Sequence, residues 1–592
     1  MSASARGSYL RRTPIFAPRR RRRSRAVANF DHIYTIRSAS RDFAPHRFVT
    51  SIASLSSHFA PRRTRAFGFM RADAFASASR ARPVARRTPS SARRRGPARA
   101  ARVVATAVTS PIQPSPDVVD ASRAASSAAC TVACFVRKDA LSFMRYPKSL
   151  AARGRFDVQG PSFGEVFEHL ARRVAWSDAD DGTLRMIVVD VDASDEEMRA
   201  SGASDADVFI AIDVDDEDTA GRVRRVTASA ATGCALNSPA LEADERICYQ
   251  PTRQLRAVRA KLTPWSQAAK DVRLMDQVKE LYARGNHLDT LLSILLLVDA
   301  SGARVPAVDI NQDITLGNVW CIASNCNKQL LACYQNPQCK KSLDCVDACG
   351  LNDQVCTYTC IRSYQNEQFE KLARCMLHKH NCLGNDAKRP QLPAVLPMTT
   401  WRGEMLTHAA AERIMQGWLG EKQYSWLAVA GQNPAYDYFP NQFQIWYKDK
   451  KNKTAFWYNP VFKVNTLDGR SVYRRSDYRC RRAETPGTFI FSFMDNGVTS
   501  EEYWRVVDAA DDLSWSLYYY AGAAKSAGQS YIGAVLATPD GLWPAEDQMD
   551  RIEDSLWRGC GVKIWEMCQV DNSTAHDGDA PLEPLHEPSL MP

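Results

Sequence analysis

The spacing of hydrophobic and polar residues changes along the chain, and these changes divide the chain into several regions. Over residues 125–315, short apolar runs alternate with stretches that carry an apolar stripe at helical spacing, which predicts an N-terminal α/β domain. The expected strands are Cys130 to Val136, Arg185 to Val191, Asp207 to Ile212 and Arg246 to Tyr249. The expected helices begin at the capping boxes Ser162/Glu165 and Ser194/Glu197, or span Ala268 to Ala283 and Leu288 to Val298.

In the second half of the chain, the segments predicted from the sequence are shorter and more closely spaced. Eight runs rich in β-formers, separated by turn residues, lie between residues 424 and 540 and predict a closed antiparallel β-barrel with room for one ligand. The runs are Trp426 to Ala430, Gln444 to Tyr447, Ala455 to Val464, Ser471 to Arg481, Thr488 to Met494, Tyr503 to Val507, Ser514 to Tyr520 and Tyr531 to Thr538. We therefore expect the barrel domain over 424–570, a helical connector over 400–423 and a disordered acidic tail over 571–592.

Cysteines are concentrated between these two regions, since ten of the 17 lie between Cys321 and Cys382. Four of their intervals, of four or seven residues, place sulfurs on one face of a helix, so we expect a disulfide-stapled helical domain over 318–386. Structural zinc is the alternative, but it favours CxxC knuckles, which this sequence lacks. We expect an oxidising compartment and no metal, while the pairing stays open. The cysteines concerned are Cys321, Cys326, Cys333, Cys339, Cys345, Cys349, Cys356, Cys360, Cys375 and Cys382.

The first 116 residues change the electrostatics of the protein. They hold 25 arginines, no lysine, no glutamate and three aspartates, a composition typical of a disordered transit peptide. Removing them from the totals of 77 basic and 66 acidic residues leaves 52 and 63, a net charge of −11. A nucleic-acid-binding arm is the alternative, but the folded modules that accompany such arms are missing, so no nucleic-acid partner is expected. The apolar run Ala124 to Val136 is favoured as a buried strand over a second signal peptide.

The sequence does not indicate a nucleotide-dependent enzyme, because neither of the phosphate-binding motifs GxGxxG and GxxxxGK[ST] occurs in it. Four aspartates lie at the carboxyl ends of predicted strands, where α/β folds bind ligands, although solvated loop acids are the simpler explanation. They are Asp190, Asp192, Asp213 and Asp215. No apolar run reaches the roughly 18 residues that cross a bilayer, so a membrane-spanning protein is excluded.

The order of a cysteine-rich helical block and then a barrel resembles the violaxanthin de-epoxidase family, and more closely its plastid members called violaxanthin de-epoxidase-related. The resemblance covers roughly residues 318 to 570 and includes Trp426, which matches the tryptophan that closes the base of lipocalin barrels. Its most specific stretches are NVWCIASNCNKQLLACYQNPQCKKSLDCVDACG, SWLAVAGQNPAYDYFPNQ and PVFKVNTLDGR. The α/β region ahead of the block looks like the related subgroup.

This resemblance implies a lipocalin-like fold and a chloroplast location, in the thylakoid lumen or at the thylakoid membrane rather than in the stroma. It also implies an oxidoreductase that reduces a xanthophyll epoxide to an alkene, with ascorbate as co-substrate and no bound cofactor. Its partners would be a xanthophyll or another apolar small molecule and, by peripheral association, the thylakoid membrane. Such a reaction needs an acid that protonates the epoxide oxygen and a cleft that holds an apolar polyene.

The resemblance also implies roles for particular residues of the barrel. Asp468 matches the family's catalytic acid/base, although Asp-Gly between two strands is equally explained as a hairpin turn. Gln442 matches a polar group near the substrate, and Asp437 is a second carboxylate close to it in the sequence; their structural alternatives are a barrel-wall hydrogen bond for Gln442 and a loop acid for Asp437. Tyr503 and Trp504 occupy the expected position of a further substrate-binding tyrosine.

A second hypothesis is a non-catalytic lipocalin-type protein of the plastid that binds a carotenoid or another apolar ligand, as a carrier or regulator. The α/β region and the replacement of a family tyrosine within Phe489 to Phe491 favour this hypothesis. Asp468 and Gln442, which the sequence retains, favour the enzyme. A twin-CxxxC protein of the mitochondrial intermembrane space is a third possibility, but such proteins usually have longer loops than the six residues between Cys349 and Cys356.

Overall fold

The computed structural model describes residues 130–154, 160–177, 184–242, 244–247, 267–301, 305, 308, 315–452 and 455–586. The expected transit peptide over 1–116 lies outside the described residues. Within them, no helix is both long enough and apolar enough to cross a membrane.

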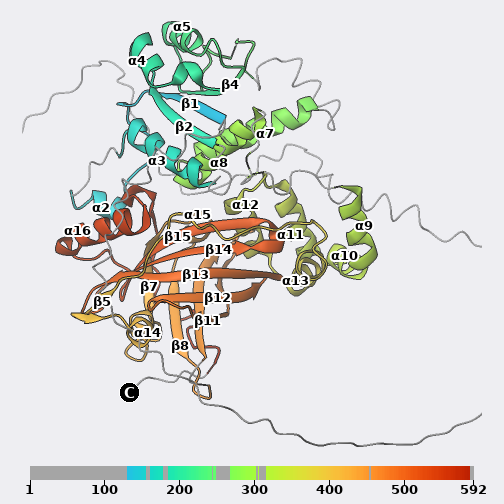
Figure 1. The fold of residues 1–592 in the computed structure, drawn as a ribbon. Helices are drawn as coiled ribbons and strands as arrows, with labels where there is room; N and C mark the ends of the chain where they lie inside the picture. Colours follow the sequence, from blue (N-terminus) through green and yellow to red (C-terminus); the bar gives the residue numbers. More distant parts are fainter. Residues whose placement is uncertain are drawn as a thin grey trace, which may run out of the picture. The chain divides into compact units, whose positions relative to one another are not determined.

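The α/β region is built on a parallel sheet with the strand order β2-β1-β3-β4 (Figure 1). Its strands are β1 (Cys130–Val136), β2 (Leu184–Asp190), β3 (Val208–Ile212) and β4 (Thr232–Leu236). Its helices are α2 (Lys148–Ala151), α3 (Phe163–Ser177), α4 (Asp195–Ala200), η2 (Ala203–Asp205), α5 (Glu217–Val226), α7 (Gln267–Ala283) and α8 (His287–Ala300). Both faces of the sheet are buried, with α3, α7 and α8 contributing to one apolar cluster and α4 and α5 to another.

Three of the four strands expected in this region are confirmed, whereas half of the fourth, at Cys248 and Tyr249, lies outside the described residues. The fourth strand of the sheet lies at Thr232–Leu236, and Ile247 makes only an isolated bridge to Gly233. The sequence Thr-Gly-Cys-Ala-Leu of β4 contains Gly233 and Ala235, which have low strand propensity, so pairing with β3 contributes more to this strand than local preference does.

Tertiary contacts also change one of the two expected capping boxes. The box of Ser194 and Glu197 at the start of α4 is complete. At α3, Ser162 Oγ accepts a hydrogen bond of 3.2 Å from the Glu165 N–H, whereas the Glu165 carboxylate accepts the indole N–H of Trp565 at 3.0 Å. The helix start expected from the sequence is therefore retained, and its glutamate contacts a residue 400 positions away.

The cysteine-rich domain consists of short helices joined by five disulfides. The helices are α9 (Leu316–Asn325), α10 (Asn327–Gln335), α11 (Pro337–Ala348), α12 (Gln354–Tyr364), α13 (Glu367–Ala373) and the π-helical turn η3 (Arg374–Lys379). The disulfides are Cys321–Cys382, Cys326–Cys375, Cys333–Cys339, Cys345–Cys360 and Cys349–Cys356. All ten cysteines expected in disulfides are paired, so this prediction is confirmed.

A short connector leads from this domain to the barrel. A helix was expected throughout 400–423, but the connector holds the hairpin β5 (Thr400–Trp401) and β6 (Glu404–Met405) before the helix α14 (His408–Gln416). The positive φ angles of Arg402 and Gly403 form the tight turn of the hairpin and prevent a helix from beginning earlier.

The barrel is antiparallel and closes on itself. Its elements are β7 (Trp426–Gly431), α15 (Pro434–Asp437), β8 (Phe443–Lys448), β9 (Phe456–Asn465), β10 (Ser471–Arg475), β11 (Tyr478–Arg482), β12 (Thr488–Asp495), β13 (Val498–Ala509), β14 (Ser516–Ala524), η4 (Lys525–Ala527) and β15 (Gln529–Thr538). β10 and β11 both pair with β9, so they act as one bent strand, and β7 pairs with β15 to complete eight strands around the barrel. The predicted barrel is confirmed.

One end of the barrel is closed by α14 (Figure 1). The Trp426 side chain is fully buried there, and its indole N–H donates to the carbonyls of Ile414 and Met415 at 3.0 and 3.1 Å. Gly417 ends α14 with a positive φ of 50°, and a Cβ at this position would lie 2.4 Å from the indole ring. Trp426 therefore has the packing role that the resemblance implied.

Residues after the barrel pack on its outer surface. They form α16 (Glu546–Asp554), η5 (Ser555–Gly559), η6 (Ile564–Glu566) and β16 (Cys568–Gln569), which pairs with β7. The expected disorder from residue 571 onward does not hold for residues 571–586. Ala575, Ala580 and Leu582 cover the outward side chains of β8 and β9, because alternation exposes an apolar outer face on these strands.

Candidate active site

A cavity of about 560 Å³ lies where the cysteine-rich helices meet the barrel. This volume lies within the range of roughly 300–1,000 Å³ that is usual for sites that bind one small molecule. The barrel supplies polar and aromatic side chains to the cavity wall, and the helices supply mainly aliphatic and aromatic ones. The apolar side chains from the helices are Leu343, Val346, Ile361, Phe369, Leu372, Ala373, Met376 and Leu377, with Tyr358 at the boundary with the barrel, and the polar ones are Asp347, Gln354 and Thr357.

Strand β13 determines which acidic side chain enters the cavity. Ser500, Glu502 and Trp504 line the cavity, while Glu501 and Tyr503, at the alternate positions, do not. This division follows from the twofold period of a strand, in which successive side chains point to opposite faces. Of two adjacent glutamates, the fold therefore buries Glu502, which is 5% exposed, and leaves Glu501 at the surface.

Glu502 is a buried carboxyl with two hydrogen-bond donors. The indole N–H of Trp504 donates to Oε2 at 2.6 Å, and the Tyr531 hydroxyl donates to Oε1 at 2.8 Å. Burial raises the pKa of Glu502 to about 7, because removal from water penalises the charged form more than the two donors stabilise it. Glu502 is thus a carboxylic acid that can hold or release a proton near neutral pH.

Asp437, at the end of α15, is a second buried carboxyl in the cavity wall. Its Oδ2 accepts the Asn433 N–H at 2.8 Å, and Gly431 allows the close approach because a Cβ there would lie 2.2 Å from the carboxyl. Burial raises the pKa of Asp437 to about 7, against the opposing hydrogen bonds from Asn433 and Gln442. The cavity therefore contains two acids that become protonated as the pH falls through neutrality.

Four tyrosines complete the polar part of the cavity, namely Tyr458, Tyr478, Tyr520 and Tyr531. Burial raises the pKa of each hydroxyl well above its ordinary value, so all four remain protonated over the physiological range. Tyr458 donates to Gln444 Oε1 and Tyr531 donates to Glu502. These side chains can orient a polar ligand atom next to Glu502 without adding charge to the cavity.

The structure brings only some of the residues implied by the resemblance into this site. Gln442, Asp437 and Trp504 line the cavity. Gln442 Nε2 also donates to the carbonyls of Tyr436 and Phe439, at 3.2 and 3.0 Å, so it additionally holds the loop before β8. Tyr503 instead points away from the cavity, where its ring lies against the guanidinium groups of Arg389 and Arg505.

Asp468 lies in the turn between β9 and β10, and it is not among the residues that line the cavity. Its Oδ1 accepts the Thr466 hydroxyl at 2.6 Å, and both carboxylate oxygens accept from the Arg470 Nε at 3.1 Å. These contacts hold the pKa of Asp468 below its ordinary value. The structure therefore supports the hairpin-turn explanation of Asp468.

Sequence reasoning missed Glu502, Tyr520 and Tyr531. The available signal was the alternation Ser500, Glu502, Trp504, Val506, in which an acid occurs in phase with apolar residues. The expected strand began at Tyr503, whereas β13 begins at Val498, so the glutamates fell outside the expected strand.

Two groups of side chains in the described residues are close enough to hold a metal ion, but both contain disulfide cysteines, which offer no thiolate.

An eight-stranded antiparallel barrel with a closed base and one ligand-sized cavity defines a lipocalin-like protein. The family model described as the VDE lipocalin domain matches residues 318–572, which covers both the cysteine-rich helices and the barrel. Residues 318–572 of this chain therefore form a VDE lipocalin domain.

Solved lipocalin structures show only distant similarity. Lobster apocrustacyanin A1 is 11% identical, with 32% of this chain and 93% of that chain covered and a TM-score of 0.20. The bovine lipocalin allergen Bos d 2 is 7% identical, with 24% and 88% covered and a TM-score of 0.19. Apocrustacyanin C1 is 11% identical, with 32% and 93% covered and a TM-score of 0.20. No curated protein matched the sequence.

Proposed function

We propose that this protein is an oxidoreductase of the violaxanthin de-epoxidase type, which reduces an epoxide on a xanthophyll to a carbon–carbon double bond with ascorbate. The observation that carries the proposal is Glu502, a carboxyl with a pKa of about 7 in the wall of a largely apolar cavity. General acids work best when their pKa lies close to the working pH. The aliphatic helical part of the wall suits the polyene, and the tyrosine-lined part suits the epoxide ring and ascorbate.

In the proposed reaction, protonated Glu502 donates its proton to the epoxide oxygen as the first carbon–oxygen bond breaks. Ascorbate supplies the two electrons, the second carbon–oxygen bond breaks, and the oxygen leaves as water. The products are the alkene, water and dehydroascorbate; of the two protons released by ascorbate, one goes to the departing oxygen to complete the water and the other restores the acid form of Glu502. Because Tyr531 donates to Oε1 and Trp504 to Oε2, the carboxyl is fixed in the cavity wall throughout.

We also propose a chloroplast location on the lumen side of the thylakoid, with peripheral membrane association. Five disulfides support an oxidising compartment. An acidifying lumen would convert Glu502 and Asp437 to their protonated forms, since both titrate near neutrality. Activity should therefore rise as the pH falls through about 7.

The test is turnover of violaxanthin with ascorbate and a galactolipid at mildly acid pH, with the pigments separated by chromatography. Glu502→Gln should lower kcat at least about 100-fold, the usual contribution of a general acid. Glu501→Gln is the matched control and should leave kcat within about twofold, because Glu501 lies at the surface. Asp468→Asn should also retain turnover, since Asp468 lies in a turn.

Two outcomes would contradict this proposal. Full turnover by Glu502→Gln would remove the acid from the mechanism, and loss of turnover in Asp468→Asn with normal folding would return the acid role to that aspartate. Pigment that co-purifies with the wild-type protein and is never converted would instead support a non-catalytic lipocalin.

A further inference from the structure

The loop between α11 and α12 forms part of the cavity wall. Gly350, Leu351 and Asn352 line the cavity, as do Cys349 and Gln354 on either side of the loop. The next turns of α12 add Thr357, Tyr358 and Ile361. The shape of this wall therefore depends on how the loop and the start of α12 are held.

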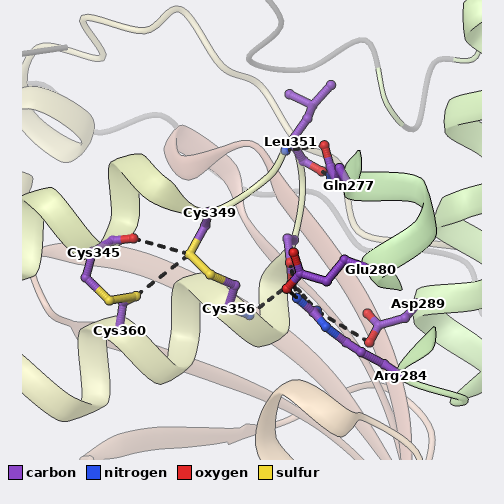
Figure 2. Close-up of a disulfide and its surroundings, with 10 residues drawn as sticks. Gln277, Glu280, Arg284, Asp289, Cys345, Cys349, Leu351, Cys356 and Cys360 are labelled. Carbon is purple, nitrogen blue, oxygen red and sulfur yellow. Dashed lines mark hydrogen bonds and ion pairs between the residues drawn. A yellow bond between two sulfur atoms is a disulfide. The ribbon is translucent and has the colours of Figure 1, made fainter. Parts of the chain in front are cut away.

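Two neighbouring disulfides fix the ends of the loop (Figure 2). Cys349–Cys356 closes a ring around it, and Cys345–Cys360 joins α11 to α12 one helical turn further on. The two bridges are in contact, since the sulfurs of Cys349 and Cys360 lie 3.8 Å apart. The covalent ring limits how far the loop can move. The backbone N–H and C=O groups in the middle of the loop still need hydrogen-bond partners from outside it.

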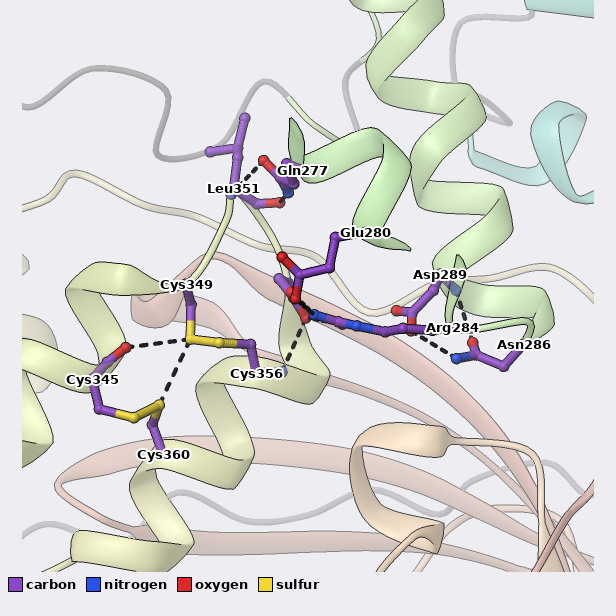
Figure 3. A network of polar contacts seen from close by, with 11 residues as sticks. Gln277, Glu280, Arg284, Asn286, Asp289, Cys345, Cys349, Leu351, Cys356 and Cys360 are labelled. Atoms are coloured by element: carbon purple, nitrogen blue, oxygen red, sulfur yellow. Dashed lines mark hydrogen bonds and ion pairs between the residues drawn. A yellow bond between two sulfur atoms is a disulfide. The ribbon is translucent and has the colours of Figure 1, made fainter. Parts of the chain in front are cut away.

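Gln277, on α7 of the α/β region, binds the centre of the loop. Its Nε2 donates to the Leu351 carbonyl at 2.7 Å, and its Oε1 accepts the Leu351 N–H at 3.0 Å (Figure 3). This reciprocal pair satisfies both backbone groups of Leu351, as a neighbouring strand would. Gly350 allows the approach, because a Cβ there would lie 2.3 Å from Gln277 Cδ.

Arg284, in the turn between α7 and α8, binds the other end of the loop. Its Nη1 and Nη2 donate to Oδ1 and Oδ2 of Asp353 at 2.8 and 2.6 Å, a bidentate geometry. Asp353 is 4% exposed, and its Oδ1 also accepts the Cys356 N–H at 3.0 Å, which caps α12. Arg284 therefore holds the residue that starts the helix of the cavity wall. The Arg284 guanidinium is itself held by the carboxylates of Glu280 and Asp289, at N···O distances of 3.1 and 3.5 Å.

We propose that Gln277 and Arg284 are positioning residues for the cavity, through which the α/β region keeps the loop and α12 in the conformation that a ligand meets. Holding a loop in its bound conformation increases affinity, because the cost of ordering the loop is then met before the ligand arrives. This gives the α/β region a role in ligand binding. The inference rests on the proposed function only in treating this cavity as the ligand site.

The experiment compares full-length variants by their affinity for the apolar fluorescent probe 1-anilinonaphthalene-8-sulfonate. Arg284→Gln and Gln277→Ala should each weaken the probe about tenfold, while Arg284→Lys should weaken it less because it keeps the charge and loses the bidentate contact. Arg153→Gln is the matched control, since Arg153 also joins the two regions, through the carbonyls of Trp543 and Pro544 at 2.9 and 2.6 Å. It should change the affinity less than about twofold.

Hydrogen exchange supplies a readout that does not depend on the probe. Peptides that cover residues 349–356 should exchange faster in Arg284→Gln and Gln277→Ala and at the wild-type rate in Arg153→Gln. Thermal unfolding of each variant verifies that the barrel remains folded. The proposal would be overturned if Arg284→Gln and Gln277→Ala both exchanged at the wild-type rate in this segment. It would also be overturned if Arg153→Gln lost as much probe affinity as these two variants.

Violaxanthin kinetics separate this proposal from the proposed reaction. Where turnover occurs, Arg284→Gln should raise KM about tenfold and leave kcat within about twofold, because the residue shapes the wall and does not touch the reacting atoms. Weaker probe binding and faster exchange, with no turnover in any form including the wild type, would contradict the reaction and retain the positioning role.

Discussion

Replacing Glu502 by glutamine should remove a specific part of the pH dependence of folding. The amide has the same shape as the acid: its oxygen can accept from the Trp504 indole and its NH2 group can donate to the Tyr531 hydroxyl oxygen, so the substitution changes mainly the ability to ionise. In the wild type, burial raises the pKa of Glu502 from its ordinary 4.5 to about 7. The folded state therefore binds this proton more tightly than the unfolded state does, and the stability that it contributes is lost as the pH rises through about 7.

The magnitude follows from these two pKa values. Between about pH 5 and about pH 8, linkage predicts that ionisation of Glu502 costs the wild type roughly 2 to 3 kcal/mol of unfolding free energy. Glu502→Gln does not incur this cost, so the stability difference between variant and wild type should shift by roughly 2 to 3 kcal/mol in favour of the variant over that range. Asp437, whose pKa is also raised, contributes equally to both proteins and cancels.

The assay is urea unfolding at several pH values with the disulfides intact, followed by tryptophan fluorescence, to which Trp426, Trp446 and Trp504 of the barrel contribute. Glu501→Gln provides the comparison for loss of a surface carboxylate, and its stability should follow the wild type within about 0.5 kcal/mol at every pH. If Glu502→Gln and the wild type lose stability in parallel between about pH 5 and about pH 8, Glu502 has no raised pKa. The proposed acid would then lack its physical basis.

Three further predictions test other parts of the site and fold. Trp504→Leu should raise KM for violaxanthin about tenfold and Tyr503→Leu should not, because only Trp504 faces the cavity; steady-state kinetics of both variants decide this. Replacing Cys349 and Cys356 together by serine should cost about 2.5 kcal/mol in denaturant unfolding, the value expected for so short a closed loop, and no loss would argue against the bridge. A chain that ends at residue 573 should lose on the order of 2 kcal/mol in the same assay, since Ala575 and Leu582 no longer cover the outer face of β8, and unchanged stability would argue against this packing.

The local pattern of residues in the sequence was enough to predict most of the fold. Alternation of apolar residues located all eight barrel runs, and the density of cysteines located the stapled helices, because both signals depend on neighbours a few residues apart. The exceptions have tertiary causes. Pairing with β3 contributes more to β4 than local preference does, and residues 571–586 are ordered against the apolar outer face of β8 and β9.

The site depended on information that no local pattern carries. The sequence shows Glu501 and Glu502 as equivalent neighbours, and only the register of β13 in a closed barrel turns one inward and desolvates it until its pKa reaches about 7. Disulfide pairing likewise required the helices to be placed in space, since Cys321 and Cys382 are 61 residues apart. By itself the sequence determined most of the secondary structure, the cysteine block and the resemblance of its C-terminal part to a known family, because these follow from composition and short-range spacing. The tertiary structure decided which acid is buried, where Asp468 lies and what the α/β region contacts, because burial and ion pairing depend on residues that are distant in the chain.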